Sequence, residues 1–281
     1  MLLAVETEVP FKHYSFSEAI KLIKETGFDA VDIDFCEDAT ALLCNSDYKE
    51  RAYELKDLLS KYDLSCNQAH APYNFTYGMA MDESEPVYLT IMRSIEAAGI
   101  IGIDHIVLHG VKTPQPAASK ASFDYNYRYI KSFEPYCEAA GVKIAFENTS
   151  YAYRFPDLMN IMMEKLDSPW YSVLVDIGHV LESAGMQPGE FIRSLDSGIL
   201  AGLHIHDNHI APNCDEHLLP YLGKVDFPDF LRALKETGYQ GDFTMEACGY
   251  LNTYAEHGLL KEAMVFEAAT GRKLIADYQA L

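Results

Sequence analysis

The chain is poor in basic residues: its 281 residues include 22 Lys and Arg against 42 Asp and Glu, a formal net charge of −20. Proteins that bind nucleic acid neutralise its phosphates with Lys and Arg, and a chain of this charge is repelled by a polyanion at long range. We therefore expect no nucleic-acid partner. No apolar run approaches the roughly 20 residues that span a bilayer, so we expect no membrane partner either.

Cysteine motifs are also lacking. None of the six cysteines forms a C-x-x-C pair, and a chain of this size does not need disulfides to fold. The first residues carry no basic region before their apolar stretch and soon include Glu6 and Glu8, unlike a secretory signal peptide. These features predict a cytoplasmic protein with reduced thiols and without a cysteine zinc site.

Strand-like and helix-like segments alternate along the chain. Eight short segments are rich in Val, Ile and Leu without strict alternation, as is typical of buried parallel strands. They are residues 2–6, 29–35, 64–70, 104–109, 142–147, 171–176, 201–206 and 242–247. Eight strands alternating with helices predict an α/β fold, and specifically a single (β/α)₈ TIM barrel domain over residues 1–281.

The helices are expected between these strands. The first begins at a capping box of Ser15 and Glu18 and stops at Gly27, and Pro86, Pro188 and Pro228 stand where later helices would start. Further helices are expected near 49–60, 86–98, 123–140, 157–166, 188–196, 228–236 and 256–279. The pattern Lys-Glu-Thr-Gly-aromatic occurs at 24–28 and 235–239, where we interpret the glycines as helix C-caps. The last helix would either close the barrel or pack on a second copy, which leaves a homo-oligomer open.

Ionisable residues stand where the predicted strands end. Active sites of (β/α)₈ barrels lie at the C-terminal ends of the strands, so these side chains should surround one mouth. Mixed His and carboxylate ligands suit zinc, manganese, cobalt or iron, and several buried ionisable groups are costly without metal or pairing. A lone strand-end His such as His70 or His109 is more often a satisfied polar group, and we do not expect His206 to be a ligand because the turn begins there. The set of Glu147, Asp176, His204 and Glu246, on four successive strands, is hard to obtain by chance.

Four stretches resemble the signature of the xylose-isomerase-like TIM barrel superfamily, and within it the group of sugar phosphate isomerases and epimerases. They are Glu147-Asn148-Thr149, Asp176-Ile177-Gly178-His179, His204-Ile205-His206-Asp207-Asn208 and Met245-Glu246. The resemblance implies a divalent metal (Mn, Zn or Co) held by Glu147, Asp176, His204 and Glu246. It also implies that Glu147 and Glu246 are catalytic and work on opposite faces of a sugar, where one removes the proton next to the carbonyl and the other returns a proton.

In that mechanism the metal stabilises an enediolate, and His179 binds a substrate oxygen. The sequence departs from the sugar epimerases at one point. They carry an Arg a few residues past the strand-seven His, whereas this chain reads Asp207-Asn208-His209-Ile210-Ala211. This difference concerns the residues that contact the substrate.

The chain is also similar to the endonuclease IV family, which binds three zinc ions. Those ligands would fall on the four residues above together with His70, His109, His179, Asp215 and His217, which are therefore additional metal or substrate ligands in our interpretation. Such a cluster would clamp a phosphodiester and activate a water, but the acidic and neutral loops lack the basic residues that a DNA-repair enzyme needs.

We therefore predict a metal-dependent isomerase or epimerase of a sugar, sugar phosphate or related polyol, with one ion expected and up to three open. A multi-zinc phosphoester hydrolase or a metal-dependent lyase on a sugar-like substrate is the alternative. A barrel that binds a sugar without catalysis is a third hypothesis, which the complete set of four residues disfavours.

Overall fold

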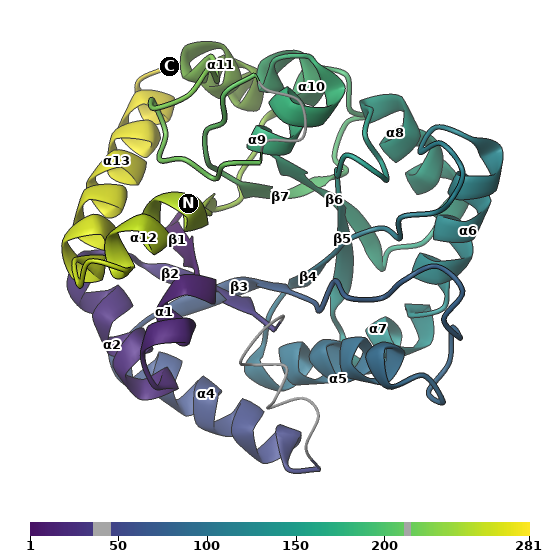
Figure 1. The fold of residues 1–281 in the computed structure, drawn as a ribbon, viewed down its shortest axis with the longest axis horizontal. Coiled ribbons are helices and arrows are strands. Elements are labelled where there is room, and N and C mark those ends of the chain that lie inside the picture. The colour runs from purple at the N-terminus through teal and green to yellow at the C-terminus, as the bar shows by residue number, and fades with distance from the viewer. Residues whose placement is uncertain (36–45, 211–214) are drawn as a thin grey trace.

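In the computed structural model, which describes residues 1–35, 46–210 and 215–281, eight parallel strands form one sheet. They are β1 (Leu3–Glu6), β2 (Ala30–Asp34), β3 (Ser65–His70), β4 (His105–Leu108), β5 (Lys143–Glu147), β6 (Tyr171–Asp176), β7 (Leu200–His204) and β8 (Phe243–Met245). Their order is β7-β6-β5-β4-β3-β2-β1-β8, and a parallel bridge between Ile205 and Met245 joins the two edges. The sheet therefore closes into the predicted (β/α)₈ barrel, with the helices around it (Figure 1).

The helices follow the sequence signals closely. They are α1 (Glu8–His13), α2 (Phe16–Thr26), α4 (Tyr48–Tyr62), α5 (Pro86–Ile101), α6 (Lys120–Lys131), α7 (Glu134–Ala140), α8 (Pro156–Leu166), α9 (Ile177–His179), the π-helix η1 (Val180–Ala184), α10 (Pro188–Arg193), α11 (Phe227–Thr237), α12 (Cys248–Ala255) and α13 (Leu260–Ala280). The Ser15–Glu18 capping box is present, and Gly27 and Gly238 adopt the left-handed conformation (φ 102° and 72°) that ends α2 and α11.

Two predicted helices differ from those in the structure: one is divided and the other begins later. The predicted helix 123–140 is α6 followed by α7, because Pro135 lacks an N–H and its ring clashes with the carbonyl four residues earlier. The predicted helix 256–279 begins later, as α13, and Gly258 at φ 71° separates it from α12. Neither difference changes the order of the barrel units.

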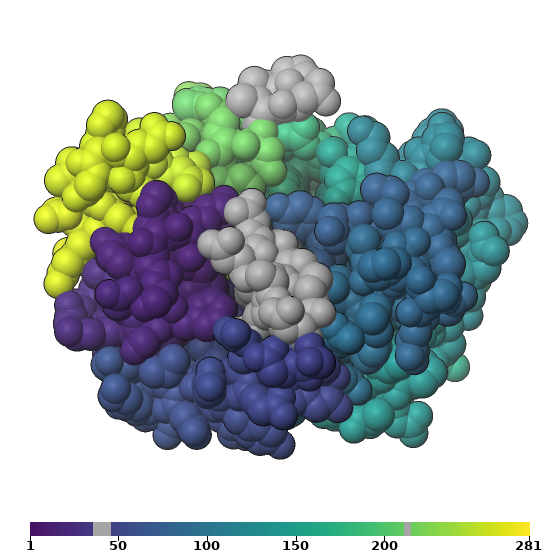
Figure 2. Space-filling model, turned by 60° about the horizontal axis from the view of Figure 1, so that its bottom comes forward, coloured from purple at the N-terminus to yellow at the C-terminus, as the bar shows by residue number. Residues whose placement is uncertain are grey.

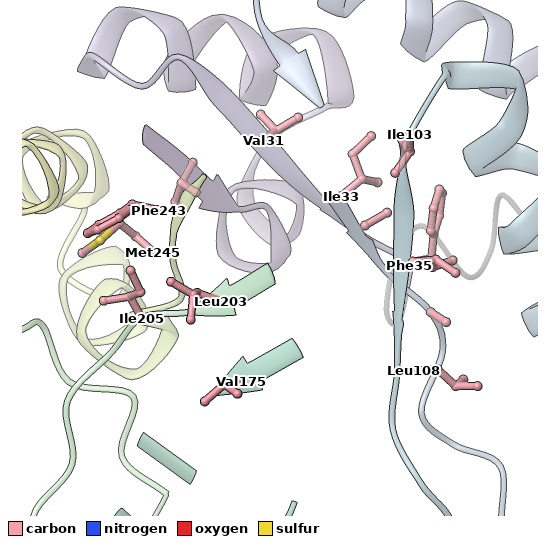
Figure 3. Close-up of a cluster of buried hydrophobic side chains, with 14 of the residues drawn as sticks. Val31, Ile33, Phe35, Ile103, Leu108, Val175, Leu203, Ile205, Phe243 and Met245 are labelled. Atoms are coloured by element: carbon pink, nitrogen blue, oxygen red, sulfur yellow. The ribbon is translucent and has the colours of Figure 1, made fainter. Parts of the chain in front are cut away.

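Side chains alternate between the two faces of the strands, which positions the site. Val31 and Ile33 of β2 and Leu203 of β7 belong to the apolar layer that packs against the helices (Figure 3). A separate, smaller apolar cluster inside the barrel consists of Val107, Ala145 and Leu174. The inward positions that follow along the same strands carry the ionisable residues, so alternation brings these to one mouth.

The first and last segments of the chain lie side by side, as the adjacent purple and yellow regions in Figures 1 and 2 show. Helix α13 packs against α2, β1 and β8, and Arg272 donates to both carboxylate oxygens of Asp29 at 2.6 and 2.7 Å. The last helix thus closes the barrel between its first and eighth units. No helix in the described parts of the chain is long and apolar enough to cross a membrane.

Candidate metal centre

A cavity of about 430 Å³ opens at the C-terminal ends of the strands. Seven of the nine residues singled out from the sequence line it, and the other two, Asp176 and His204, are fully buried behind this lining. The described residues that line the cavity include no Lys or Arg. The predicted site residues therefore come together in one place, in surroundings that are rich in carboxylates and imidazoles.

The first group of ligand atoms comes from His70, His109 and Glu147, at the ends of β3, β4 and β5. Nδ1 of His70 donates to the carbonyl of Ala71 (2.8 Å), and Nδ1 of His109 is paired with the hydroxyl of Tyr151 (3.2 Å). The two Nε2 atoms therefore face each other at 3.1 Å, and they lie 3.5 and 3.1 Å from Oε2 of Glu147. Two imidazole lone pairs and a carboxylate oxygen aimed at one point suit a divalent metal.

The second group consists of His179, Asp215 and His217. Nδ1 of His179 donates to the carbonyl of Asn148, and Nδ1 of His217 donates to that of Glu246, both at 2.9 Å. These bonds turn the Nε2 atoms of both rings toward Oδ2 of Asp215, at 2.9 and 3.0 Å. Asp215 and His217, which are two residues apart in the sequence, thus form a second set of three convergent ligand atoms with His179.

The loop after β7 is shaped by Asp207 and Asn208, for which the sequence alone suggested no structural role. Asn208 donates to Oδ1 of Asp215 (3.0 Å) and accepts the backbone N–H of His217 (3.2 Å). Asp207 accepts the backbone N–H of Gly223 at 2.8 Å. This pair therefore holds the second group of ligands over the barrel mouth.

Three members of the four-residue set, Glu147, His204 and Glu246, meet beside these two groups. The fourth, Asp176, has a ligand atom within 4.8 Å of ligand atoms of Glu147 and His179. Nδ1 of His204 lies 3.5 Å from Oε2 of Glu147 and 3.3 Å from Oε2 of Glu246. Neither this Nδ1 nor Oε2 of Glu246 has a hydrogen-bond partner among the described residues, although both atoms are buried. Orphaned buried polar atoms are costly, and a cation between them would satisfy both. The donor set therefore fits a metal ion.

The electrostatics of the two glutamates differ. Burial alone would raise the pKa of Glu147, but the charges of His109 and His204 outweigh it and hold the pKa well below its usual value. Burial raises the pKa of Glu246 well above its usual value, and the charges of Asp176 and Glu147 add to this against the attraction of His204. The pKa values of these two carboxyl groups, which belong to one site, are thus shifted in opposite directions.

Positive charge is stabilised at this mouth. Burial opposes protonation of His179 and His217, yet the carboxylates of Asp176 and Asp215 outweigh it and raise the pKa of both rings. The pKa of His204 is raised in the same way, against burial, by Glu246 and Glu147. Protons on these rings neutralise the nearby carboxylates, and a bound metal ion would neutralise the same carboxylates in their place.

His206, which the sequence led us to leave out of the ligand set, lies in the site. It follows His204 by two residues, and strand alternation turns both rings into the barrel. Its Nε2 lies 2.9 Å from the Asp176 carboxylate, and its ring stacks on His217 with centroids 3.9 Å apart. Gly178 makes room for it, because a Cβ there would lie 2.0 Å from the ring. His206 therefore orients two of the candidate ligands.

Strands β1 and β2 contribute two further carboxylates that the sequence reasoning missed. Glu6 and Asp34 end these strands and line the cavity. Burial, followed by the charge of Asp34, raises the pKa of Glu6 well above its usual value. The strand-end rule used for the later strands would have found both residues. Tyr73, 51% exposed, stacks on His109 at the rim with centroids 5.3 Å apart.

The comparisons with known proteins agree with this geometry. Residues 20–267 match the family model described as a xylose isomerase-like TIM barrel. The chain belongs to this family. The resemblance inferred from the four strand-end stretches is thereby confirmed.

Members of the xylose isomerase-like TIM barrel family similar to this chain include a sugar epimerase. The L-ribulose-5-phosphate 3-epimerase UlaE of Salmonella paratyphi A is 26% identical over 241 residues, which cover 82% of this chain and 81% of the relative. A D-tagatose 3-epimerase-like protein has the same fold, with a TM-score of 0.76 at 24% identity over 100% of this chain and 97% of its own. The IolI protein with a bound zinc atom also has a TM-score of 0.76, at 16% identity over 99% and 98% of the two chains.

Proposed function

We propose that this chain is a divalent-metal-dependent epimerase or isomerase of a sugar or related polyol. The observation that supports it best is the convergence of Glu147, from β5, and Glu246, after β8, on Nδ1 of His204. Two carboxylates from different sides of one mouth can reach the two faces of a substrate bound between them. The epimerase named among the relatives and the zinc-bearing structure support the same proposal.

The chemistry follows from what these residues can hold and move. A metal ion held by Glu147, Asp176, His204 and Glu246 supplies, when bound, a Lewis acid beside the carbonyl and hydroxyl oxygens of the sugar. One glutamate takes the proton from the carbon next to the carbonyl, and the other returns a proton to the opposite face. His179 would hydrogen-bond a substrate oxygen through Nε2, the ring nitrogen that pairs with Asp215 in this structure.

The lining of the cavity favours a sugar without a phosphate group. The described lining residues include no Lys or Arg, and the segments 36–45 and 211–214 contain none in sequence. Glu6 and Asp34 add two carboxyl groups on the side of β1 and β2, where the hydroxyl groups of a sugar can form hydrogen bonds with them. We therefore expect free ketoses or polyol-derived ketones to be better substrates than their phosphate esters.

The test is exchange of a carbon-bound proton with solvent. Metal-loaded protein in deuterated water should incorporate deuterium next to the carbonyl of at least one ketose in a broad panel. Glu147→Gln and Glu246→Gln should each lower this rate by roughly 10²–10⁴-fold, the usual contribution of general acid–base catalysis. Glu262→Gln, an exposed glutamate of α13, is the matched control. A panel without any exchange would contradict the proposal.

A second candidate function, phosphoester hydrolysis at several zinc ions, is favoured by one specific observation. The groups His70–His109–Glu147 and His179–Asp215–His217 each present three convergent ligand atoms beside the central set. Metal analysis of protein purified without added metal or chelator would separate the two functions. Two or three zinc ions per chain together with cleavage of a generic phosphodiester would favour the hydrolase, whereas one ion with ketose exchange would favour the epimerase.

A further inference from the structure

A chain of polar side chains runs through the barrel interior beneath the candidate metal centre. Nε2 of His204 lies 3.0 Å from Oδ2 of Asp32, and the side-chain amide of Gln68 donates to the same oxygen. The other end of that amide, Oε1 of Gln68, pairs with Nε2 of His105 at 3.0 Å. Asp32 and His204 are 0% exposed and Gln68 is 5% exposed, so water competes little for these bonds.

Such an interior is unusual for this fold, because the inward positions of (β/α)₈ barrels are mostly filled by branched apolar residues. A buried carboxylate is costly unless other groups compensate it. Gly202 on β7 leaves the space that the polar chain occupies, since a Cβ there would lie 2.4 Å from Oε1 of Gln68 and 2.8 Å from Nε2 of His105. The sequence thus keeps both the polar groups and the room for them.

We propose that Asp32 is a positioning residue for the metal, acting through His204; this inference rests on the proposed metal-dependent function. A carboxylate accepts hydrogen bonds but does not donate them, so Nε2 of His204 carries the proton. In the neutral ring Nδ1 then keeps its lone pair, and this is the atom that faces Glu147 and Glu246 at 3.5 and 3.3 Å. Gln68, held by His105, keeps the Asp32 carboxylate turned toward the ring.

Outer carboxylates that orient metal-binding histidines typically contribute about 10–100-fold to metal affinity. We therefore expect Asp32→Asn to weaken Zn²⁺ binding by about 10–100-fold, measured by competition with a chromophoric chelator. Asp29→Asn is the matched control, because Asp29 lies just before β2 and pairs with Arg272 rather than with a candidate ligand. Its Zn²⁺ affinity should stay close to that of the wild-type chain.

A second variant and a second readout separate positioning from folding. Gln68→Met keeps the approximate length of the side chain but removes both the donor to Asp32 and the acceptor that pairs with His105. It leaves the Asp32–His204 pair in place, so it should weaken Zn²⁺ binding less than Asp32→Asn while the chain stays folded. Nitrogen NMR of ¹⁵N-histidine-labelled, metal-free protein, at a pH where the ring is neutral, should place the proton of His204 on Nε2. Loss of this preference in Asp32→Asn would not follow from a purely structural role.

The outcomes are distinct. A Zn²⁺ affinity of Asp32→Asn equal to that of the control, or a proton on Nδ1 of His204 in the wild-type chain, would overturn the inference. A wild-type chain that binds no Zn²⁺ would instead contradict the proposed function, and the position of the proton alone would then decide whether Asp32 orients His204.

Discussion

Single residues decide how this barrel responds to pH, and Glu267 is the clearest case. The side chain of Glu267, on α13, is 0% exposed, and neither carboxylate oxygen has a well-formed hydrogen bond among the described residues. Burial, weakly offset by the backbone N–H of Ala247, raises its pKa to about 8 from an ordinary value of 4.5. The folded chain therefore keeps a proton that the unfolded chain releases across this range.

The consequence is a loss of stability as the pH rises. Between pH 4.5 and about 8 the native state binds more protons than the unfolded state at Glu267, so the free energy of unfolding falls with pH. Glu267→Gln should leave stability near pH 5 within about 1 kcal/mol of wild type and raise it by about 2–4 kcal/mol near pH 8. Urea unfolding at both pH values measures this, with Glu262→Gln as the exposed control. Parallel stability profiles for Glu267→Gln and wild type would refute the assignment.

At the same scale, the sequence revealed the residues that end strands but not those within them. Glu147, Asp176 and Glu246 could be found because a parallel barrel places strand ends together. Asp32 and Gln68 lie in the interior of β2 and β3, and the partner of Asp32, His204, is 172 positions away. Only the closed barrel shows that these side chains meet, so no local pattern could have predicted them.

Among the elements, strand positions were predicted well and helix breaks less so. The segment 171–176 coincides with β6, because a run of β-branched and aromatic residues between turns is a strong signal. The π-helix η1 after α9 and the break between α6 and α7 were missed. The sequence does signal the break between α6 and α7, through Pro135, but the periodicity of the segment hides it. The π-helix has no comparable local signal.

Helix ends provide a prediction at this scale. Gly238 ends α11 at φ 72°, and among the described residues nothing beyond its chain neighbours and its own helix backbone lies within 4 Å of the position that a Cβ would take there. Gly238→Ala therefore adds no clash and only the cost of a left-handed residue, so we expect it to lower the free energy of unfolding by about 1–2 kcal/mol. The converse change, Asp167→Gly at the C-cap of α8 (φ 41°), should be neutral or stabilising. The midpoint of chemical unfolding should therefore fall for Gly238→Ala. For Asp167→Gly it should stay the same or rise.

For the whole molecule, the excess of acidic groups is consistent with the candidate metal centre, because carboxylates surround the mouth where that centre lies. Carboxylates from β1, β2, β5, β6 and the region after β8 surround a mouth without a described Lys or Arg, in a chain with a net charge of −20. Such a mouth attracts cations and repels polyanions. The absence of a nucleic-acid partner, the cytoplasmic location and the oligomeric state stay predictions, whereas the single barrel was predictable because every unit repeats the same strand–helix pattern.

Metal removal should therefore destabilise the entire barrel. Glu147 belongs both to the first group of candidate ligands and to the four-residue set. The candidate ligands come from most of the strands, so a bound ion would hold distant parts of the chain together. Zn²⁺ at about 100 times its dissociation constant would add about 2.7 kcal/mol, which corresponds to roughly 4–6 °C in Tm for a domain of this size. Differential scanning calorimetry with Zn²⁺ and with a chelator measures the shift.

The shift in Tm on metal binding should be larger at pH 8 than at pH 6. Carboxylates raise the pKa of His179, His204 and His217, and the metal must displace the protons on these rings. Glu147→Gln should lose most of the shift, and an equal Tm with and without metal would show that the cluster is held by its own ion pairs alone.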